Sequence, residues 1–425
     1  MSLAAFDWTT RVRPIVEVGI GITRVPTTNA ARWDVGRWDS ASSVWAGTQP
    51  SWWDITCDVR SFRCEYGRAA TVDRFVPGVA NVVLDNASGW ADPSTNPDPT
   101  VLTMRPGREI RLGVVHEVYG TRWLFRGFVD AMEPRYLPTD TDTVELSCVD
   151  ALGEVNRAKV VPSATPVGAG ETVNVRIARL LDLAKWASDR RRLDATGETL
   201  VGDDLGGQIA DLLGQAADSG GGSVFADTTG DLVFRQRDWQ TYVPGTPVDG
   251  TIGNVAPTDV CPTGWERPFR RADMSTRVII GRNLETAQTI DDTAGQGLYG
   301  IEPFERTDLL TATDSTLTRL GQRILEVRSA ASTPRIRSVS LDARTSTAAL
   351  DLMTTVDVFR PSRYRCRLQY PRGTVFDAEH LATGVAHEVT PRYWSLDLNL
   401  DLAAPFAAPG GRWDGAYWDR STWAA

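Results

Sequence analysis

The sequence contains very little lysine and histidine, and its charge balance is acidic. Only Lys159 and Lys185 are lysines among 45 basic residues, only three residues are histidines, and the formal net charge is −9. Such a chain lacks the broad basic surface with which proteins displace counterions from nucleic-acid phosphates. We therefore expect no specific nucleic-acid binding, and the shortage of histidine argues against a Ser-His-Asp triad.

Cysteine pairs and long apolar runs are also missing. The five cysteines form no Cys-X-X-Cys pair and leave an odd count, which excludes a disulfide framework and a zinc module. This usage is typical of assembly in a reducing cytoplasm. No apolar run approaches the ~20 residues that span a bilayer, and the N-terminal residues lack a hydrophobic signal core. We expect neither a membrane anchor nor a cleaved signal.

Motifs for catalysis and cofactor binding are equally scarce. There is no phosphate-binding loop, and the stretch 18–21 lacks the third glycine of a dinucleotide fingerprint. His387 is not followed by a second histidine four residues on, and a metal pair of His380 with His387 is less plausible than two ordinary histidines. We predict no enzyme activity, catalytic residue, cofactor or metal. The remaining enzyme alternative is a carboxylate pair for glycoside cleavage, with Asp140-Thr141-Asp142 or Asp291-Asp292 as candidates.

What the sequence does contain is a series of two-faced strand patterns. Apolar residues alternate with polar or small ones, most clearly at Trp394, Leu396, Leu398, Leu400 and Leu402. Similar alternations occur at 16–22, 110–114, 144–148 and 364–370. Strands with one apolar face belong to antiparallel sheets that pack one side on a core. The chain is therefore predicted to be mainly β.

Helical periodicity is confined to a few segments. Residues 172–187 and 205–217 each carry an apolar stripe, and a hairpin follows with its turn at 227–230. A third helix is predicted over 314–330, with Asp314 as its N-cap. Two helices and a hairpin in succession indicate a small α+β unit inserted in a β-rich chain.

A Trp-Asp tag occurs twice, once near each end of the chain. Residues 32–46 read RWDVGRWDSASSVWA and residues 412–424 read RWDGAYWDRSTWA. Tryptophan is enriched at protein interfaces because its ring buries a large apolar area and keeps one N–H for a polar partner. The candidate interface residues are those shared by the two tags: Trp33, Asp34, Trp38, Asp39, Trp45, Trp413, Asp414, Trp418, Asp419 and Trp423.

Three interpretations of the tags stay open. Both tags could lie on one face and clip onto a neighbouring subunit, or each could fasten its own terminus to the body of the chain. The indole rings could instead stack on sugars.

The stretch 53–135 resembles the N-terminal region of minor tail proteins, or tail hub proteins, of long-tailed actinobacterial phages. The similarity rests on VVLDN at 82–86 with Gly89 and Asp92-Pro93, RPG at 105–107, IRL at 110–112 and LFRG at 124–127. VDAL at 149–152 and the closing GVAHEVTPRYWSLDLNLDL at 384–402 fit the same family.

This resemblance implies a mainly β, overall α+β fold with tandem hub-type β-barrel domains and an inserted small α+β domain. The expected division is an N-terminal strand and tag at 1–54, a first barrel at 55–160, the insertion at 161–244, a second barrel with one helix at 245–405, and the C-terminal tag at 406–425.

The implied role is a ring-shaped hub at the virion tail tip, assembled in the host cytoplasm, with a homotrimer favoured. Its expected partners are a distal tail or tube protein, the tape-measure protein, and receptor-binding or tip proteins. The alternatives are a cell-wall sugar-binding tail protein that uses its Trp motifs and a tail-associated peptidoglycan hydrolase.

Overall fold

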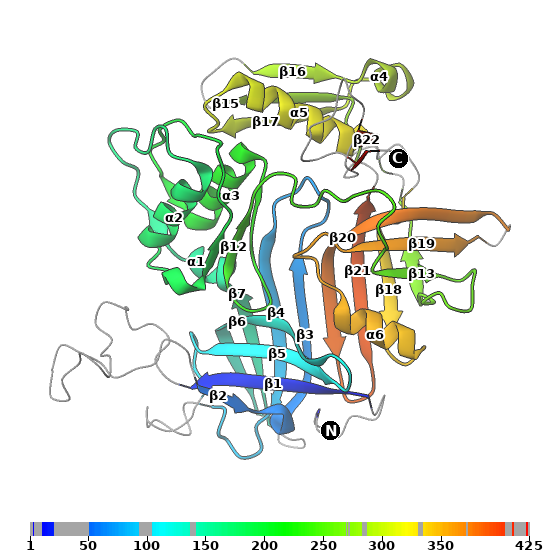
Figure 1. Cartoon of the computed structure of the whole chain (residues 1–425). Helices are drawn as coiled ribbons and strands as arrows, with labels where there is room; N and C mark the ends of the chain where they lie inside the picture. Colours follow the sequence, from blue (N-terminus) through cyan, green and yellow to red (C-terminus); the bar gives the residue numbers. More distant parts are fainter. Residues whose placement is uncertain are drawn as a thin grey trace.

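The computed structural model describes residues 3, 11–20, 51–92, 104–136, 142–268, 270, 273–282, 287–329, 335–370, 373–403, 410–411 and 422–423. These residues build one large sheet, a smaller α+β unit beside it and a third unit over one end of the sheet (Figure 1). The described part of the chain holds no helix that is both long and apolar enough to cross a membrane.

The large sheet has 13 strands, which come from both halves of the chain. The first half supplies β1 (Val12–Ile20), β2 (Ser51–Asp54), β3 (Val59–Gly67), β4 (Val76–Asp85), β5 (Glu109–His116), β6 (Gly120–Arg135) and β7 (Thr143–Asp150). The second half supplies β13 (Gly250–Gly253), β14 (Gly264–Glu266), β18 (Ser338–Asp342), β19 (Arg363–Gln369), β20 (Val375–Val389) and β21 (Trp394–Leu402). The order is β14-β18-β21-β20-β3-β4-β7-β6-β5-β1-β2, with β19 and β13 branching from β20.

The prediction of closed barrels is wrong, although the mainly β class is confirmed. Strand β3 pairs with β20, in the register Tyr66 with Val385 and Cys64 with His387, so the two halves share one hydrogen-bonded ladder. Each half uses an edge strand to extend the other half and therefore does not close on itself. Among the described residues, the terminal strands β2 and β14 are each paired on one side only.

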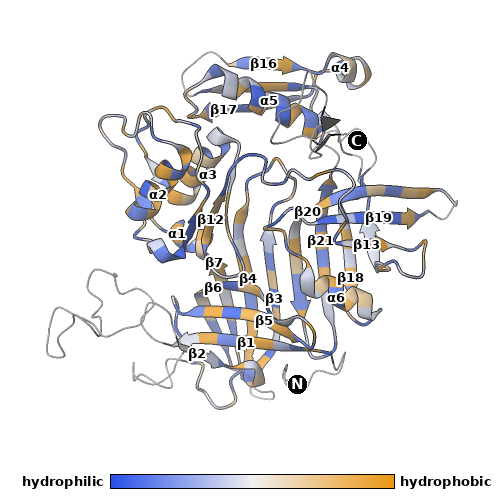
Figure 2. Cartoon of the chain, viewed as in Figure 1, coloured by the Kyte–Doolittle hydropathy of each residue, from blue (hydrophilic) through white to orange (hydrophobic). Residues whose placement is uncertain are grey.

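The predicted alternation places the core correctly. Along β21 the side chains of Trp394, Leu396, Leu398 and Leu400 are fully buried, and Figure 2 shows the strands banded in hydrophobic and hydrophilic residues. Helix α6 (Thr347–Thr355) packs against the same core through Ala349, Leu350 and Met353. A short 3-10 helix, η3 (Thr56–Asp58), joins β2 to β3.

The smaller α+β unit contains the predicted helices and hairpin. It consists of α1 (Ala151–Val155), β8 (Lys159–Val160), α2 (Val173–Leu183), η4 (Ser188–Arg190), β9 (Arg191–Leu193), β10 (Gly207–Gln208), α3 (Ile209–Gly220), β11 (Ser223–Ala226) and β12 (Leu232–Arg235). Strand β12 pairs antiparallel with β11 and parallel with β9. The apolar stripes of α2 and α3 meet in a core of their own.

The third unit is a three-stranded sheet covered by one helix; the helix was predicted over 314–330, whereas the sequence patterns did not indicate the sheet. Strand β15 (Arg277–Arg282) lies between β16 (Gln288–Asp291) and β17 (Pro303–Leu309), with α4 (Thr293–Tyr299) at one end. Helix α5 (Asp314–Ser329) covers the sheet with Leu317 and Leu320. The helix begins at Asp314, which therefore lies in its first turn. The proposed domain boundaries themselves stay a prediction.

Candidate functional site

The ten tag residues lie outside the described part of the chain, apart from the backbone of Trp423. That residue belongs to β23 (Thr422–Trp423), which pairs with β22 (Gly410–Gly411). What the structure does place is the point at which each tag is attached. The first tag connects β1 to β2, and the second follows β21, whose last residues lie at the opposite end of the large sheet (Figure 1).

The two histidines considered for a metal pair are buried core residues of β20. The ring of His380 accepts a hydrogen bond from the backbone N–H of Ile336 at 3.1 Å. The ring of His387 faces the indole N–H of Trp394 at 3.3 Å. Burial lowers their pKa values to about 4 and about 3, so the neutral rings are the stable form. Within the described ranges, no three His, Cys, Asp or Glu side chains gather as a metal site would need.

The acidic residues considered for glycoside cleavage have structural partners instead. Asp291 forms an ion pair with Arg277 at 2.6 Å. Asp292 accepts a hydrogen bond from the backbone N–H of Gly295 at 2.9 Å and so caps α4. Asp142 is described and Asp140 is not. Asp291 therefore serves ion pairing and Asp292 serves helix capping.

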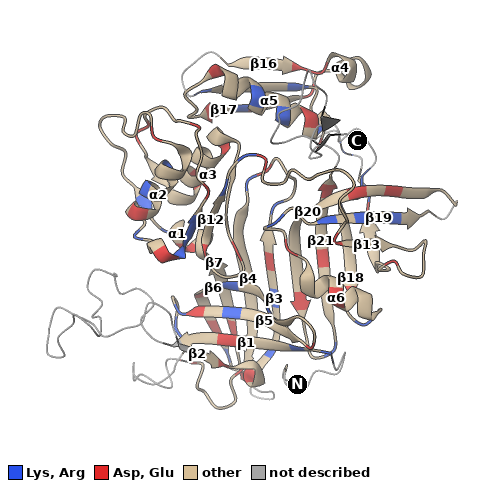
Figure 3. Cartoon of the chain, in the orientation of Figure 1, with Lys and Arg blue, Asp and Glu red and all other residues tan. Residues whose placement is uncertain are grey.

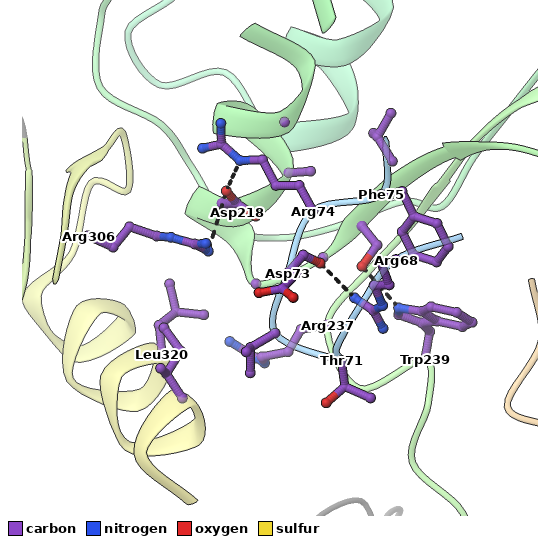
Figure 4. Close-up of a pocket in the computed structure, with 18 of the residues that line it drawn as sticks. Arg68, Thr71, Asp73, Arg74, Phe75, Asp218, Arg237, Trp239, Arg306 and Leu320 are labelled. Atoms are coloured by element: carbon purple, nitrogen blue, oxygen red, sulfur yellow. Dashed lines mark hydrogen bonds and ion pairs between the residues drawn. The ribbon is translucent and has the colours of Figure 1, made fainter. Parts of the chain in front are cut away.

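The most distinctive site is a cavity of about 350 Å³ where the three units meet. Figure 4 shows its lining residues converging from the loop between β3 and β4, from α3, from the segment after β12, and from β17 and α5. We call it the junction cavity because the three units meet there. Its lining residue Thr71 is hydrogen-bonded to Asp401, so the cavity lies near the last residues of β21.

The loop that carries much of the cavity wall, residues 68–75, is held firmly on the sheet. It starts at Gly67, whose φ of +112° is a conformation that side chains rarely adopt. A Cβ there would also lie only 2.5 Å from the Cα of Gly384. Both the backbone conformation and this close contact therefore require glycine at position 67. The loop is then fixed because Asp401 accepts hydrogen bonds from the backbone N–H and the hydroxyl of Thr71, at 3.0 and 2.8 Å.

An ion cluster across the cavity ties the loop to the other two units. The carboxylate of Asp218 on α3 accepts from the Arg74 guanidinium at 2.5 Å and lies 3.4 Å from that of Arg306 on β17. Arg74 also reaches Asp308 at 3.3 Å. The carboxylate of Asp218, which belongs to the α+β unit, therefore links the sheet loop to the third unit. Figure 3 shows basic and acidic residues interspersed through the same three units.

Arg68 occupies a different environment at the same cavity. Its side chain donates to the amide oxygen of Gln240 at 2.5 Å and to the backbone oxygen of Asp73 at 3.3 Å. Its guanidinium lies 4.7 Å from the ring centre of Phe75 and 5.9 Å from that of Trp239. Burial lowers the pKa of Arg68 to about 10, and the charges of Asp401, Asp73 and Asp218 partly oppose this effect.

A second polar contact, which we call the Glu109 clamp, joins the α+β unit to the sheet. The carboxylate of Glu109 accepts from Arg126 at 2.8 Å and also from Arg190. The same two guanidinium groups donate to the backbone oxygens of Thr229 and Gly230 in the β11–β12 turn, both at 2.9 Å. Glu109 is only 1% exposed, so its charge depends on these two arginines.

Neither site was predicted from the sequence. The cavity residues come from several separate segments, and their spacing follows no helical or strand period. The sequence analysis predicted no element around Gly67 and Arg68, where the wall of the cavity begins.

Comparisons with known proteins give the context of this fold. No family model matches the sequence. No curated protein matches it either. Among solved structures, a tail protein from Neisseria meningitidis MC58 has a TM-score of 0.57 at 12% identity, covering 93% of this chain and 99% of that one. The 43 kDa tail protein of prophage MuSo2 from Shewanella oneidensis has a TM-score of 0.55 at 12% identity, with the same coverage.

The chain has the fold of these phage tail proteins. A chain of the Francisella PdpA–VgrG complex is also similar, with a TM-score of 0.50 at 10% identity over 97% of this chain and 55% of that one. Because the likeness to the two tail proteins covers nearly the whole of both chains, it includes the large sheet and both smaller units.

Proposed function

We propose that the protein is a structural component of a phage tail tip that forms a ring-shaped hub. The hub would close or adapt the tail tube and connect it to the tape-measure protein and to receptor-binding proteins. The observation that carries the proposal is the whole-length likeness to two tail proteins, which extends to 99% of each of those chains. The sequence motifs favour a phage of actinobacteria as the source.

The open sheet supports an assembled state. Strands β2 and β14 each have one described neighbour, and an unpaired strand edge presents backbone donors and acceptors that another chain can use. Closed rings follow when such a contact repeats between different surfaces of identical subunits. We favour a trimer. The net charge of −9 would suit a central channel that must not retain DNA.

The tags are the proposed contact segments of this assembly. Trp33, Trp38, Trp413 and Trp418, with the aspartates that follow them, would dock either on a neighbouring subunit or on the body of their own chain. Their attachment at opposite ends of the large sheet favours separate contacts for the two copies.

The first test is the mass of the purified protein by light scattering, followed by class averages from negative-stain images. We expect three times the chain mass of 46.5 kDa and rings with a central hole. A variant with Trp413→Ala and Trp418→Ala tests the contribution of the second tag. The matched control is Arg420→Ala with Ser421→Ala in the same segment.

The result that would contradict the hub is a protein that stays monomeric when mixed with lysates containing the other tail proteins and is absent from purified virions. If that monomer also bound cell-wall glycans on an array, the sugar-binding alternative would replace the hub.

A further inference from the structure

Asp150 is the residue at which the chain passes from the large sheet into the α+β unit. It is the last residue of β7 and the N-cap of α1. One carboxylate oxygen accepts from the backbone N–H of Gly78 in β4 at 2.6 Å, and the other accepts from that of Gly153 in α1 at 2.8 Å. A Cβ at position 78 would lie only 2.9 Å from the nearer oxygen, so glycine permits this approach. We call Asp150, Gly78 and Gly153 the Asp150 joint.

The Asp150 joint connects elements that belong to different cores. Helix α1 packs against β4, β6 and β7. Its apolar side chains, however, belong to the core of the α+β unit, which contains Ala151, Leu152 and Val155. Strand β4 contributes Val82 to the core of the large sheet. The carboxyl group of Asp150 therefore attaches the first turn of the α+β unit to the sheet.

This carboxyl group is buried without a cation. Asp150 is 5% exposed, and no arginine or lysine of the described part of the chain forms an ion pair with it. Moving a carboxylate from water into such a site is costly, and binding a proton removes that cost. Burial accordingly raises the pKa of Asp150 to about 7, and the backbone N–H groups of Gly153, Gly78 and Leu152 partly oppose this effect.

The charged and titratable side chains around the joint have partners of their own. Tyr66 of β3, Arg126 of β6 and Asp227 of the β11–β12 turn line a small cavity together with Asp150, and Glu154 follows on α1. The three charged groups among them are paired: Arg126 with Glu109, Asp227 with Arg192, and Glu154 with Arg157. Burial raises the pKa of Tyr66 well above its ordinary value, so its hydroxyl stays neutral. Asp150 is therefore the group of this set that can gain or lose a proton without breaking an ion pair.

We propose that the Asp150 joint is a pH-sensitive attachment of the α+β unit to the large sheet. The joint is closed most tightly in mild acid, when the carboxyl group carries a proton, and ionisation of Asp150 at and above neutral pH favours opening. In the open joint α1 separates from β4 and the carboxylate reaches water, while the sheet and the core of the α+β unit stay folded. This inference does not depend on the role of the protein in a tail.

The direction of the effect follows from the proton affinities of the two states. In the closed joint the carboxyl group keeps its proton up to a pKa of about 7, whereas in the open joint it is hydrated and has its ordinary pKa of about 4. The closed joint therefore binds a proton more tightly, and lowering the pH favours closure. For these two values the opening constant rises about tenfold from about pH 6 to about pH 8 and then levels off.

The first test is hydrogen exchange of the full-length protein, measured by mass spectrometry across this pH range. The rates are expressed as protection factors, which correct for the intrinsic pH dependence of exchange. We expect the protection of segments 76–80 and 151–156 to fall about tenfold from about pH 6 to about pH 8, while that of β21 stays constant. In Asp150→Asn, which has no ionisable group at this position, we expect the same protection at every pH. The matched control is Glu145→Gln, which neutralises a 36% exposed carboxylate on the same strand and should keep the tenfold change.

Infrared difference spectra provide a second measurement that needs no variant to fold. The C=O stretching band of a protonated carboxyl group reports the proton on Asp150 directly. We expect this band at about pH 6 in the unaltered protein and in Glu145→Gln, with loss of the band toward about pH 8. We expect no such band in Asp150→Asn.

Either measurement can overturn the proposal. Protection factors that do not change with pH in the unaltered protein, or that change equally in Asp150→Asn, would show that ionisation of Asp150 does not open the joint. A carboxyl band that persists in Asp150→Asn would assign the proton to another group. The absence of the band from the unaltered protein at about pH 6 would show that Asp150 is already ionised there.

Discussion

Replacing Glu109 by Gln should loosen the α+β unit from the large sheet while leaving both units folded. The substitution keeps the size of the side chain and an oxygen acceptor but removes the negative charge. Arg126 and Arg190, whose side chains are 14% and 11% exposed, then share a neutral partner. Burial already lowers the pKa of Arg190, and the charge of Glu109 opposes that effect. The carboxylate of Glu109 therefore offsets the cost of burying the guanidinium groups of Arg126 and Arg190.

The expected magnitude follows from the geometry. Removing one partner of a buried ion pair costs about 3–5 kcal/mol. The lower end applies here because both guanidinium groups keep their bonds to the backbone oxygens of Thr229 and Gly230. A cost of about 3 kcal/mol, confined to the contact between the units, would speed exchange through local opening about 100-fold.

Hydrogen exchange with mass spectrometry is the suitable assay because a chain with several cores need not unfold in one step. We expect faster exchange in the turn at 226–232 and unchanged exchange in β20 and β21. The control is Glu117→Gln, since Glu117 is 51% exposed and its pair with Arg11 lies on the surface. A change below threefold in the turn, or an equal change throughout the chain, would refute the role of the clamp.

Three further perturbations test the packing around the sheet. Burial lowers the pKa of His387 to about 3. Its neutral ring therefore contributes fully to stability above pH about 6.5, and this contribution is lost as the pH falls toward 3. We expect the melting temperature of His387→Gln to decrease less over that pH range than that of the unaltered protein. Burial also raises the pKa of Asp150 to about 7, which acts with the opposite sign, so the variant must be compared with the unaltered protein at each pH. Asp150→Ala removes the acceptor for backbone N–H groups of β4 and α1 at 2.6 and 2.8 Å and should cost about 1–3 kcal/mol in chemical denaturation, with Asp150→Asn costing less. Gly67→Ala adds a Cβ that lies 2.5 Å from Gly384 and should lower the melting temperature by several degrees, more than Gly373→Ala, where φ is also positive but the space is open.

The sequence patterns predicted individual elements better than their arrangement. The alternation at 394–402 became β21. The stripe at 172–187 became the shorter helix α2, and the stripe at 205–217 became α3, which starts and ends a few residues later. Period alone specifies which side of a strand is buried, so these predictions succeeded. The period does not specify which strand pairs with which. Strand β3 pairs with β20, more than 300 positions away, and this pairing joins the two halves in one sheet instead of two closed barrels.

The junction cavity escaped prediction for a related reason. Arg74, Asp218 and Arg306 come from three separate segments, and their ion cluster forms only where the three units meet. The third unit itself was missed because its strands are short and partly exposed, so β16 and β17 show weak alternation. The tags, in contrast, are recognisable in the sequence by their repetition, but the repetition does not specify which surface they contact.

The contacts between the units differ in kind from the cores within them. The cores are apolar, as in the Val278, Ile280 and Leu309 cluster of the third unit, whereas the unit boundaries carry the Glu109 clamp and the Asp218 cluster. Interfaces rich in charged groups hold domains less tightly than apolar ones and allow relative movement. We therefore expect the position of the third unit relative to the large sheet to change more readily than the fold of any single unit.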